Sequence, residues 1–381
     1  MKYTNLLLND LSVSIRFSSF EKENAGEYHA MIEGNEALLS AETQYANIEK
    51  ALKHLAGKIL PRRATLVLKR YFVSDAVNHA AFLTNEGNEL AAVSIVQQPP
   101  LNGTKVSLWA YFVENAKITA NGENAVVMEH SAYRHLFDMQ LHSHSSSEFI
   151  QTEGIIGHYT GKLNRQGCTL ADNTIRTWVF VQGVDTHYAG MVKARTLYFR
   201  DQGLTERTHY IASTGIEGKY IYPETLVLMD AYAIAGIGSK QMIYLKGATH
   251  LNSTHEYGVT FERATAVDYG DRRHIFVSGT ASINNKGQIV FPLDLSKQTE
   301  RTLENVGVLL NEGGATMEDI AQMIIYLRDT ADYRTIFSYF EGKYPDIPKT
   351  IVYAPVCRPG WLIEIECIAV KEVENKNYAA F

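Results

Sequence analysis

The sequence predicts an α+β fold in which one structural unit occurs three times and the three units close into an intramolecular pseudo-trimer. One pattern of strand, helix, strand, helix and closing strand recurs near residues 11–115, 125–236 and 257–373. The chain has 381 residues, more than the roughly 250–300 residues that one hydrophobic core usually accommodates. Because a repeat of this length cannot cover both faces of its own sheet, the three units should pack on one another.

The third unit shows its elements most clearly. Apolar residues at helical spacing over 302–310 predict a helix that ends at Gly313, and the apolar run 323–327 predicts the next strand. A second amphipathic helix should include 336–340, and the run 362–368 should be the closing strand.

The first and middle units repeat this order with weaker signals. The first should close with a strand over 106–112 and the middle with a strand over 225–230. No Pro/Gly/Ser-rich linker separates the units, so we expect one compact molecule. We divide the chain into residues 1–120, 121–250 and 251–381, of which the first two are degenerate copies.

Composition argues against several classes of protein. A formal charge of −6 argues against a nucleic-acid partner, and three cysteines, Cys168, Cys357 and Cys367, are too few for a disulfide scaffold. The most apolar stretch, 226–238, contains Asp230 and is too short to span a bilayer, and the N-terminus does not resemble a signal peptide. We expect a soluble cytoplasmic protein with a small-molecule substrate and no membrane partner, either a monomeric pseudo-trimer or a small homo-oligomer.

The three closing strands differ in chemistry at one position. Glu364 stands five residues after a proline, Leu228 stands five residues after the corresponding proline, and Ser107 holds this place in the first unit. Because side chains alternate along a strand, Glu364 and Glu366 share one face. Two carboxylates about 7 Å apart on a buried strand raise each other's pKa, as a general acid near neutral pH requires. Glu364 is therefore the predicted acid; the alternative is that the pair faces solvent or is neutralised by Arg or Lys.

We predict neither a metal nor a cofactor. His142 and His144, with His130 and His135 nearby, could form a metal pair, but no Cys or carboxylate stands at ligand spacing. The glycine-containing segment 235–240 follows a closing strand without opening a helix, which indicates a turn and not a phosphate loop.

Four segments of the third unit carry a family resemblance. They cover residues 276–282, 314–320, 326–329 and 362–366. Together they resemble the Rid (reactive-intermediate deaminase, YjgF-type) superfamily, whose members are usually trimers of a chorismate-mutase-like fold with sites at the subunit clefts. The resemblance therefore implies three Rid-like repeats in one chain.

Further motifs resemble those of the chorismatases, single-chain relatives that hydrolyse chorismate or remove its pyruvate. The matching segments are 176–178, Arg195 with Phe199, 212–216, 257–264, 278–283 and 356–359 ahead of Glu364. Residues 179–180, 200–204 and 284–288 depart from the family pattern. These departures leave the substrate open.

The resemblance implies a site at the cleft between the middle and third units. Besides Glu364, its substrate-binding residues would be Arg176, Trp178, Arg195, Thr214, Tyr257, Gly279, Thr280, Arg334, Lys349 and Cys357. Chorismate is a dianion with an acid-labile enol ether, so the cations would bind its carboxylates and Glu364 would protonate the enolpyruvyl carbon. The resemblance also implies that Cys357 is a wall residue that steers the product, since chorismatases with cysteine at this place tend toward 3-hydroxybenzoate; the product expected is a dihydroxycyclohexadienoate or a hydroxybenzoate. The alternatives are solvated helix positions for Arg195 and Arg334, and simple packing for the Cys357 thiol.

A second function remains open, namely a Rid-type imine deaminase or a non-catalytic protein that binds small carboxylates. In the simple deaminases an arginine 15 residues before the glutamate binds the substrate carboxylate, and Lys349 takes that place here. Lysine lacks the bidentate fork of arginine, which weakens the deaminase interpretation.

Overall fold

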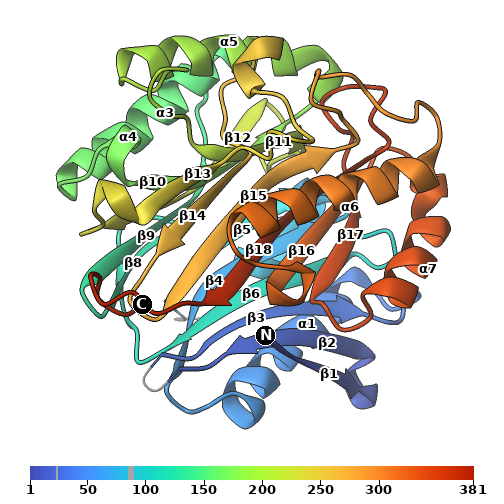
Figure 1. The fold of residues 1–381 in the computed structure, drawn as a ribbon. Helices are drawn as coiled ribbons and strands as arrows, with labels where there is room; N and C mark the ends of the chain where they lie inside the picture. Colours follow the sequence, from blue (N-terminus) through green and yellow to red (C-terminus); the bar gives the residue numbers. More distant parts are fainter. Residues whose placement is uncertain (23–24, 85–89) are drawn as a thin grey trace.

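The computed structural model describes residues 1–22, 25–84 and 90–381, and it contains three six-stranded sheets that follow one another along the chain (Figure 1). Each sheet has helices packed on it, which confirms the α+β class and the three repeated units. No helix in this described part of the chain combines the length and apolar character needed to cross a membrane.

The first unit has the strand order β1-β2-β3-β6-β4-β5. Its elements are β1 (Lys2–Leu8), β2 (Val13–Phe20), β3 (Glu27–Gly34), α1 (Ala41–His54), β4 (Ala64–Val73), α2 (Ala76–Thr84), β5 (Ala92–Gln97) and β6 (Val106–Glu114).

The second unit has the order β11-β10-β12-β9-β8-β7, which is the same arrangement read from the other edge. Its elements are β7 (Lys117–Ala120), β8 (Ala125–His130), β9 (Tyr133–Leu141), α3 (Glu148–Arg165), α4 (Leu170–Asn173), β10 (Thr174–Val181), α5 (Val184–Asp201), β11 (Ala212–Glu217) and β12 (Val227–Ala235).

The third unit has the order β13-β14-β15-β18-β16-β17. Its elements are β13 (Met242–Leu245), β14 (Ala264–Asp268), β15 (Arg272–Ala281), α6 (Leu295–Glu312), β16 (Ile320–Leu327), α7 (Tyr333–Lys343), β17 (Lys349–Tyr353) and β18 (Ile363–Glu372). The second sheet thus begins at Lys117 and the third at Met242, a few residues before the divisions expected at 121 and 251.

Side-chain caps set the starts of the principal helices. Ser40 accepts a hydrogen bond from the backbone of Thr43 at the start of α1 (3.2 Å), and Ser147 does the same at the start of α3. Asp294 accepts from the backbone of Lys297 at the start of α6 (3.0 Å). Each cap satisfies a backbone N–H that has no partner within its own helix, which fixes where the helix begins.

The closing strands β6, β12 and β18 occupy equivalent central places in their sheets, each between two neighbouring strands of its own unit. Ser107, Leu228 and Glu364 are each the second residue of their closing strand. Each lies opposite an aromatic residue of the adjacent strand, namely Phe72, Phe180 and Tyr326. The predicted equivalence of these three positions is therefore confirmed by the register.

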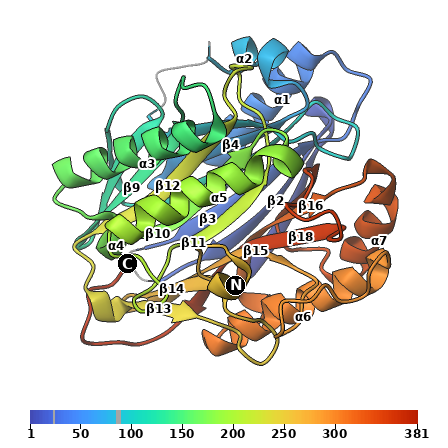
Figure 2. The same cartoon turned by 90° about the horizontal axis from the view of Figure 1, so that it is seen from above.

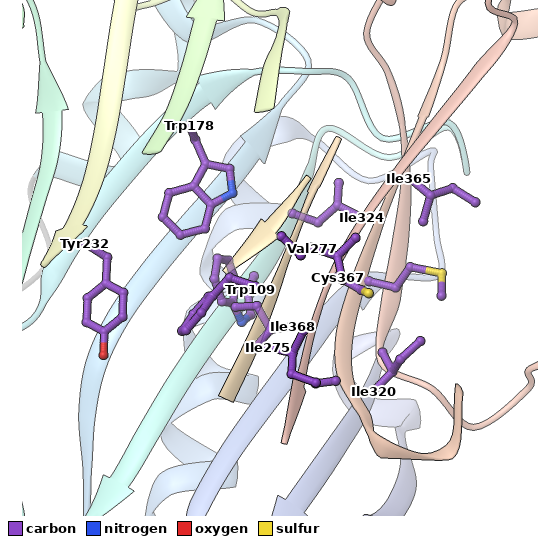
Figure 3. Packing of buried hydrophobic residues seen from close by; sticks show 14 of the residues in the cluster. Trp109, Trp178, Tyr232, Ile275, Val277, Ile320, Ile324, Ile365, Cys367 and Ile368 are labelled. Carbon is purple, nitrogen blue, oxygen red and sulfur yellow. The ribbon is translucent and has the colours of Figure 1, made fainter. Parts of the chain in front are cut away.

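The helices lie outside and the sheets meet inside (Figure 2). Helix α1 packs on β3 and β6, α3 and α5 pack together over the second sheet, and α6 packs on β15 and β18. Buried residues of all three units form one continuous hydrophobic cluster, in which the rings of Trp109 and Trp178 meet edge to face at 6.2 Å (Figure 3). This shared burial explains why no linker separates the units.

A buried polar cluster also crosses between units. Glu27 of β3 pairs with Arg272 (2.6 Å) and His274 (2.9 Å) of β15. Burial alone would raise the pKa of Glu27, but these two partners outweigh burial and hold it far below its usual range. Burial lowers the pKa of His29 and of His135 to about 3, so both rings are neutral in the folded protein.

Candidate functional site

A cavity of about 490 Å³ lies between the second and third units. Helix α5 contributes Tyr188 and Arg195 to its wall, and the segment before β14 contributes Arg263. The segment before β18 contributes Cys357, and β18 itself contributes Glu364. A volume of this size accommodates a small organic ligand.

Glu364 is the acidic group in this wall, with only 4% of its surface exposed. Burial raises the pKa of Glu364 to about 8, the nearby Glu366 adds to the rise, and Arg176 and Arg263 oppose it. At neutral pH the Glu364 side chain is therefore a neutral carboxylic acid that can donate a proton into the cavity.

A β-bulge places Glu364 against the neighbouring strand. The register between β15 and β18 shifts between Val277 and Thr280, so that Ser278 and Gly279 form the irregular step. A β-carbon at Gly279 would collide with the Glu364 carboxyl oxygen. A larger residue here would therefore displace the acid, and bulges of this kind often re-aim side chains next to active sites.

Glu366, two residues further along β18, is held by three donors from the second unit. Arg176 Nη2 lies 2.8 Å from its carboxylate, Trp178 Nε1 donates at 2.7 Å, and the Thr214 hydroxyl donates to the same group. Arg176 also stacks over the Trp178 ring at 5.0 Å. Both partners of the ion pair are almost completely buried, so this cluster links the two units behind the cavity wall.

The structure brings four of the expected site residues into the cavity wall, namely Glu364, Arg195, Gly279 and Cys357. The other expected residues near the site lie behind this wall. Arg176, Trp178 and Thr214 hold Glu366, and the buried Thr280 donates its hydroxyl to the backbone oxygen of Ser278 (2.9 Å). The expectation that Arg176 faces the substrate is corrected by this geometry, because its guanidinium is engaged by Glu366.

Two expected cations lie elsewhere. Lys349 is buried between the first and third units, where its ammonium lies 3.0 Å from Glu341 and 2.9 Å from the backbone oxygen of Tyr344. Arg334 is exposed on α7. Neither is in the cavity wall, so the expectation that they bind a substrate there is not met. The side chain of Tyr257 lies outside the part of the chain that the structure describes.

The structure adds three cations to the cavity wall that the sequence analysis did not name, namely Lys193, Arg263 and Arg358. Arg263, 5% exposed, donates to the backbone oxygen of Asn252 (3.1 Å) and lies over the Phe261 ring at 5.4 Å. Arg358 lies 5.1 Å from the ring of Trp361. Arg263 and Arg358 lie in the segments 257–264 and 356–359, which resemble chorismatase motifs. Their place in these motifs was the sequence signal that could have identified them as site residues.

The histidines do not gather into a metal site. The rings of His142 and His144 are 5.2 Å apart, and His142 Nδ1 lies 2.8 Å from the backbone oxygen of Gln140. Among the residues that the structure describes, no three His, Cys, Asp or Glu side chains are grouped to hold a metal ion.

The strand register identifies which residues of the other two units occupy the positions of Glu364 and Gly279. These residues explain why the other two interfaces differ from this one. Between the first and second units, Leu228 replaces Glu364, and Gln140 stands at the bulge position that Gly279 holds. Between the third and first units, Ser107 replaces Glu364 and lies 3.1 Å from Thr350, and β3 pairs with β6 without a bulge. Only the second and third units thus combine a glutamate with the space that a glycine leaves.

Comparison with known proteins places the third unit in a family. The family model described as endoribonuclease L-PSP matches residues 262–371. A RutC family protein of Pyrococcus abyssi is 31% identical over 100 residues, which are 26% of this chain and 79% of that protein. The mitochondrial protein mmf2 of Schizosaccharomyces pombe is 34% identical over 102 residues, again 26% of this chain and 79% of that protein. The chain therefore belongs to the Rid (YjgF-type, endoribonuclease L-PSP) superfamily.

A solved structure shares the arrangement of most of the chain. A chorismatase crystal structure superposes with a TM-score of 0.64, covering 80% of this chain and 93% of its own, at 17% sequence identity. The three-unit architecture of this chain is thus that of a chorismatase fold.

Proposed function

We propose that this protein is a chorismatase-like enzyme that cleaves the enolpyruvyl ether of chorismate, or of a related cyclic carboxylate, and releases pyruvate. The observation that carries the proposal is Glu364, a buried carboxylic acid with a pKa of about 8 that faces a cavity of ligand size. Cleavage of an enol ether begins with protonation of its terminal carbon, which needs an acid that is still protonated at neutral pH.

The proposed reaction balances without a cofactor. Glu364 gives its proton to the methylene carbon of the enolpyruvyl group, and a water molecule adds to the resulting oxocarbenium carbon. One proton of this water returns to the Glu364 carboxylate, which leaves a hemiketal. The hemiketal then collapses to pyruvate and a dihydroxycyclohexadienoate as its hydroxyl proton passes to the ring oxygen that leaves. Loss of water from the ring would instead lead to a hydroxybenzoate.

The cations in the wall suit a dianionic substrate. Arg195 from α5 and Arg263 from the third unit approach the cavity from different units, and Arg358 stands beside the loop of Cys357. Arginine binds carboxylates through paired N–H groups, so cations from two units would orient the two carboxylates of one ligand.

Cys357 fits the role of a wall residue. Removal from water raises the pKa of its thiol to about 12, and the nearby Glu364 carboxyl adds to the rise. The sulfur is therefore a neutral thiol at physiological pH and not the thiolate that nucleophilic chemistry requires. Its position in the same cavity wall as the acid supports an influence on which product forms.

Membership of the superfamily keeps a second candidate, a Rid-type imine deaminase. A carboxyl that remains protonated at neutral pH suits protonation of carbon better than binding of a cationic iminium ion. Lys349, at the position of the deaminase arginine, lies outside the cavity wall. Both features favour the enol-ether reaction.

The test is turnover of chorismate, followed by its absorbance and by chromatography of pyruvate, dihydroxydienoate and hydroxybenzoates. Wild type should release pyruvate without added metal or nucleotide. Glu364→Gln should reduce turnover by roughly 10²–10⁴-fold while binding is retained, and Glu304→Gln, on an exposed helix surface, is the matched control. Absence of turnover in the wild type at any enzyme concentration would favour a binding protein, and wild-type rates in Glu364→Gln would exclude this acid.

A further inference from the structure

We propose that Glu366 is a positioning residue for this site: it is a fixed carboxylate whose charge keeps the proton on Glu364. The inference deepens the proposed function, on which its effect on turnover rests, but its effect on the Glu364 proton is measurable without any substrate. It also gives Arg176 a role different from substrate binding.

The hydrogen bonds of Glu366 fix it as a carboxylate. Its two oxygens accept from three donors, Arg176 Nη2 at 2.8 Å, Trp178 Nε1 at 2.7 Å and the Thr214 hydroxyl. The Thr214 oxygen in turn accepts from the backbone N–H of Gly279 at 2.9 Å, so the same hydroxyl anchors the bulge. A carboxylate bound to a guanidinium and two further donors is stable in its charged form.

The effect of Glu366 on the ionisation of Glu364 follows from the alternation of side chains along the strand. Alternate residues of a strand point to the same face about 7 Å apart, and Glu364 and Glu366 are both buried, with 4% and 1% of their surfaces exposed. With an effective dielectric constant of about 20, one fixed negative charge at this distance opposes ionisation of its neighbour by about one to two pH units.

Other charged or titratable groups also face Glu364. Arg176 on β10 and Arg263 before β14 favour its ionisation, and Cys357 and Tyr326 interact with it as neutral groups. The remaining cations of the wall, including Arg195, come from α5 and the segment before β18. Because every cation favours the charged form, the opposing charge close to the acid comes from Glu366.

The interface between the first two units repeats this anchor without the acid. Asp230 occupies the fourth position of β12, as Glu366 does on β18, and accepts hydrogen bonds from Ser94 (2.6 Å) and Arg70 (2.8 Å). Ser94 and Thr214 hold equivalent places, because they pair with Arg70 and Trp178 in the same register. The second position of β12 holds Leu228, so no acid stands two residues before Asp230. The anchored carboxylate of Asp230 therefore joins two units without acting on an acid. This makes Asp230 the control for the added role of Glu366.

The experiment is a titration of glutamate δ-carbons by carbon-13 NMR in the full chain, with the Glu364 signal assigned from Glu364→Gln. In wild type the Glu364 signal should titrate with a midpoint near pH 8. In Glu366→Gln the Glu364 midpoint should fall by about one to two pH units. Glu366→Asp, which keeps the charge, should restore most of the shift, and Asp230→Asn should leave the midpoint unchanged.

Several results would overturn the inference. These are an unchanged Glu364 midpoint in Glu366→Gln and an equal shift in Asp230→Asn. A fall of about one to two pH units in Glu366→Asp, which keeps the charge, would also overturn the inference, so it stays testable if Glu366→Gln does not fold. If the protein turns over chorismate, the alkaline limb of its pH profile should move with the NMR midpoint; if it does not, the titration still decides the role of Glu366.

Discussion

Replacement of Glu364 by glutamine should stabilise the protein at neutral pH even though it removes the proposed acid. Burial, assisted by Glu366, raises the pKa of Glu364 from its ordinary value of 4.5 to about 8. Between these values the unfolded chain ionises this carboxyl while the folded protein keeps it protonated, so a rise in pH favours the unfolded state. The contribution of the neutral carboxyl to the free energy of unfolding is therefore fully present below pH 4.5. It is lost progressively as the pH rises toward 8.

The size of the effect follows from the pKa difference. One pKa unit corresponds to about 1.4 kcal/mol. Keeping Glu364 protonated in the folded protein therefore lowers the free energy of unfolding at pH 7 by up to about 3 kcal/mol. The cost approaches about 5 kcal/mol above pH 8. Glutamine has nearly the same shape and does not ionise, so Glu364→Gln should avoid this cost and should gain nothing below pH 4.5.

The measurement is urea unfolding at pH 4.5, 6, 7 and 8, followed by tryptophan fluorescence. The free energy of unfolding of Glu364→Gln should exceed that of wild type by an amount that grows with pH. Glu304→Gln should show no such trend, because Glu304 is an exposed residue of α6. A difference that is constant from pH 4.5 to 8, or that favours wild type at pH 8, would refute the assignment of a protonated Glu364.

The three remaining predictions concern the pH dependence of turnover, the Gly279 bulge and two buried histidines. Turnover by wild type should fall as the pH rises through about 8, where Glu364 loses its proton, and a rate that increases across this range would contradict its role as an acid. Gly279→Ala should lower turnover roughly 10²-fold, because its β-carbon would displace the Glu364 carboxyl, while Gly307→Ala on α6, where a β-carbon meets nothing within 4 Å, should retain activity. Stability should fall below about pH 6.5, because protonation of His29 and His135, whose pKa values burial lowers to about 3, favours the unfolded chain; an unfolding midpoint in urea that stays constant between pH 7 and 4 would contradict this.

Local periodicity and side-chain alternation were sufficient to predict the three units and the unusual position of Glu364. The closing strands are long apolar runs, and their alignment depends only on the order of elements within one unit. Ser107, Leu228 and Glu364 could therefore be compared before any tertiary contact was known, and the register confirms that they are equivalent.

The roles of the cations could not be predicted in the same way, because they depend on contacts between units. Arg176 and Glu366 are 190 residues apart in the chain and meet only when the second and third sheets pack together. Lys349 stands 15 residues before Glu364 in the sequence, yet it lies at a different interface, on the edge strand β17. Sequence spacing within one unit carries no information about which neighbouring unit a side chain faces.

Because the three units of this chain differ, the loss of stability caused by the proposed site is confined to one interface. A buried protonated carboxyl that costs about 3 kcal/mol at pH 7 takes up a large part of the roughly 5–15 kcal/mol that stabilises a native domain. The interface of the first two units avoids this cost through Leu228 and the ion pair of Asp230 with Arg70, whose charges are both fully buried. In a trimer of identical units every interface would carry the same acid, glycine and cavity. Divergence of the three copies therefore allows one interface to carry the acid, the glycine and the cavity, while the other two carry ion pairs such as Arg70 with Asp230 and Arg16 with Glu341.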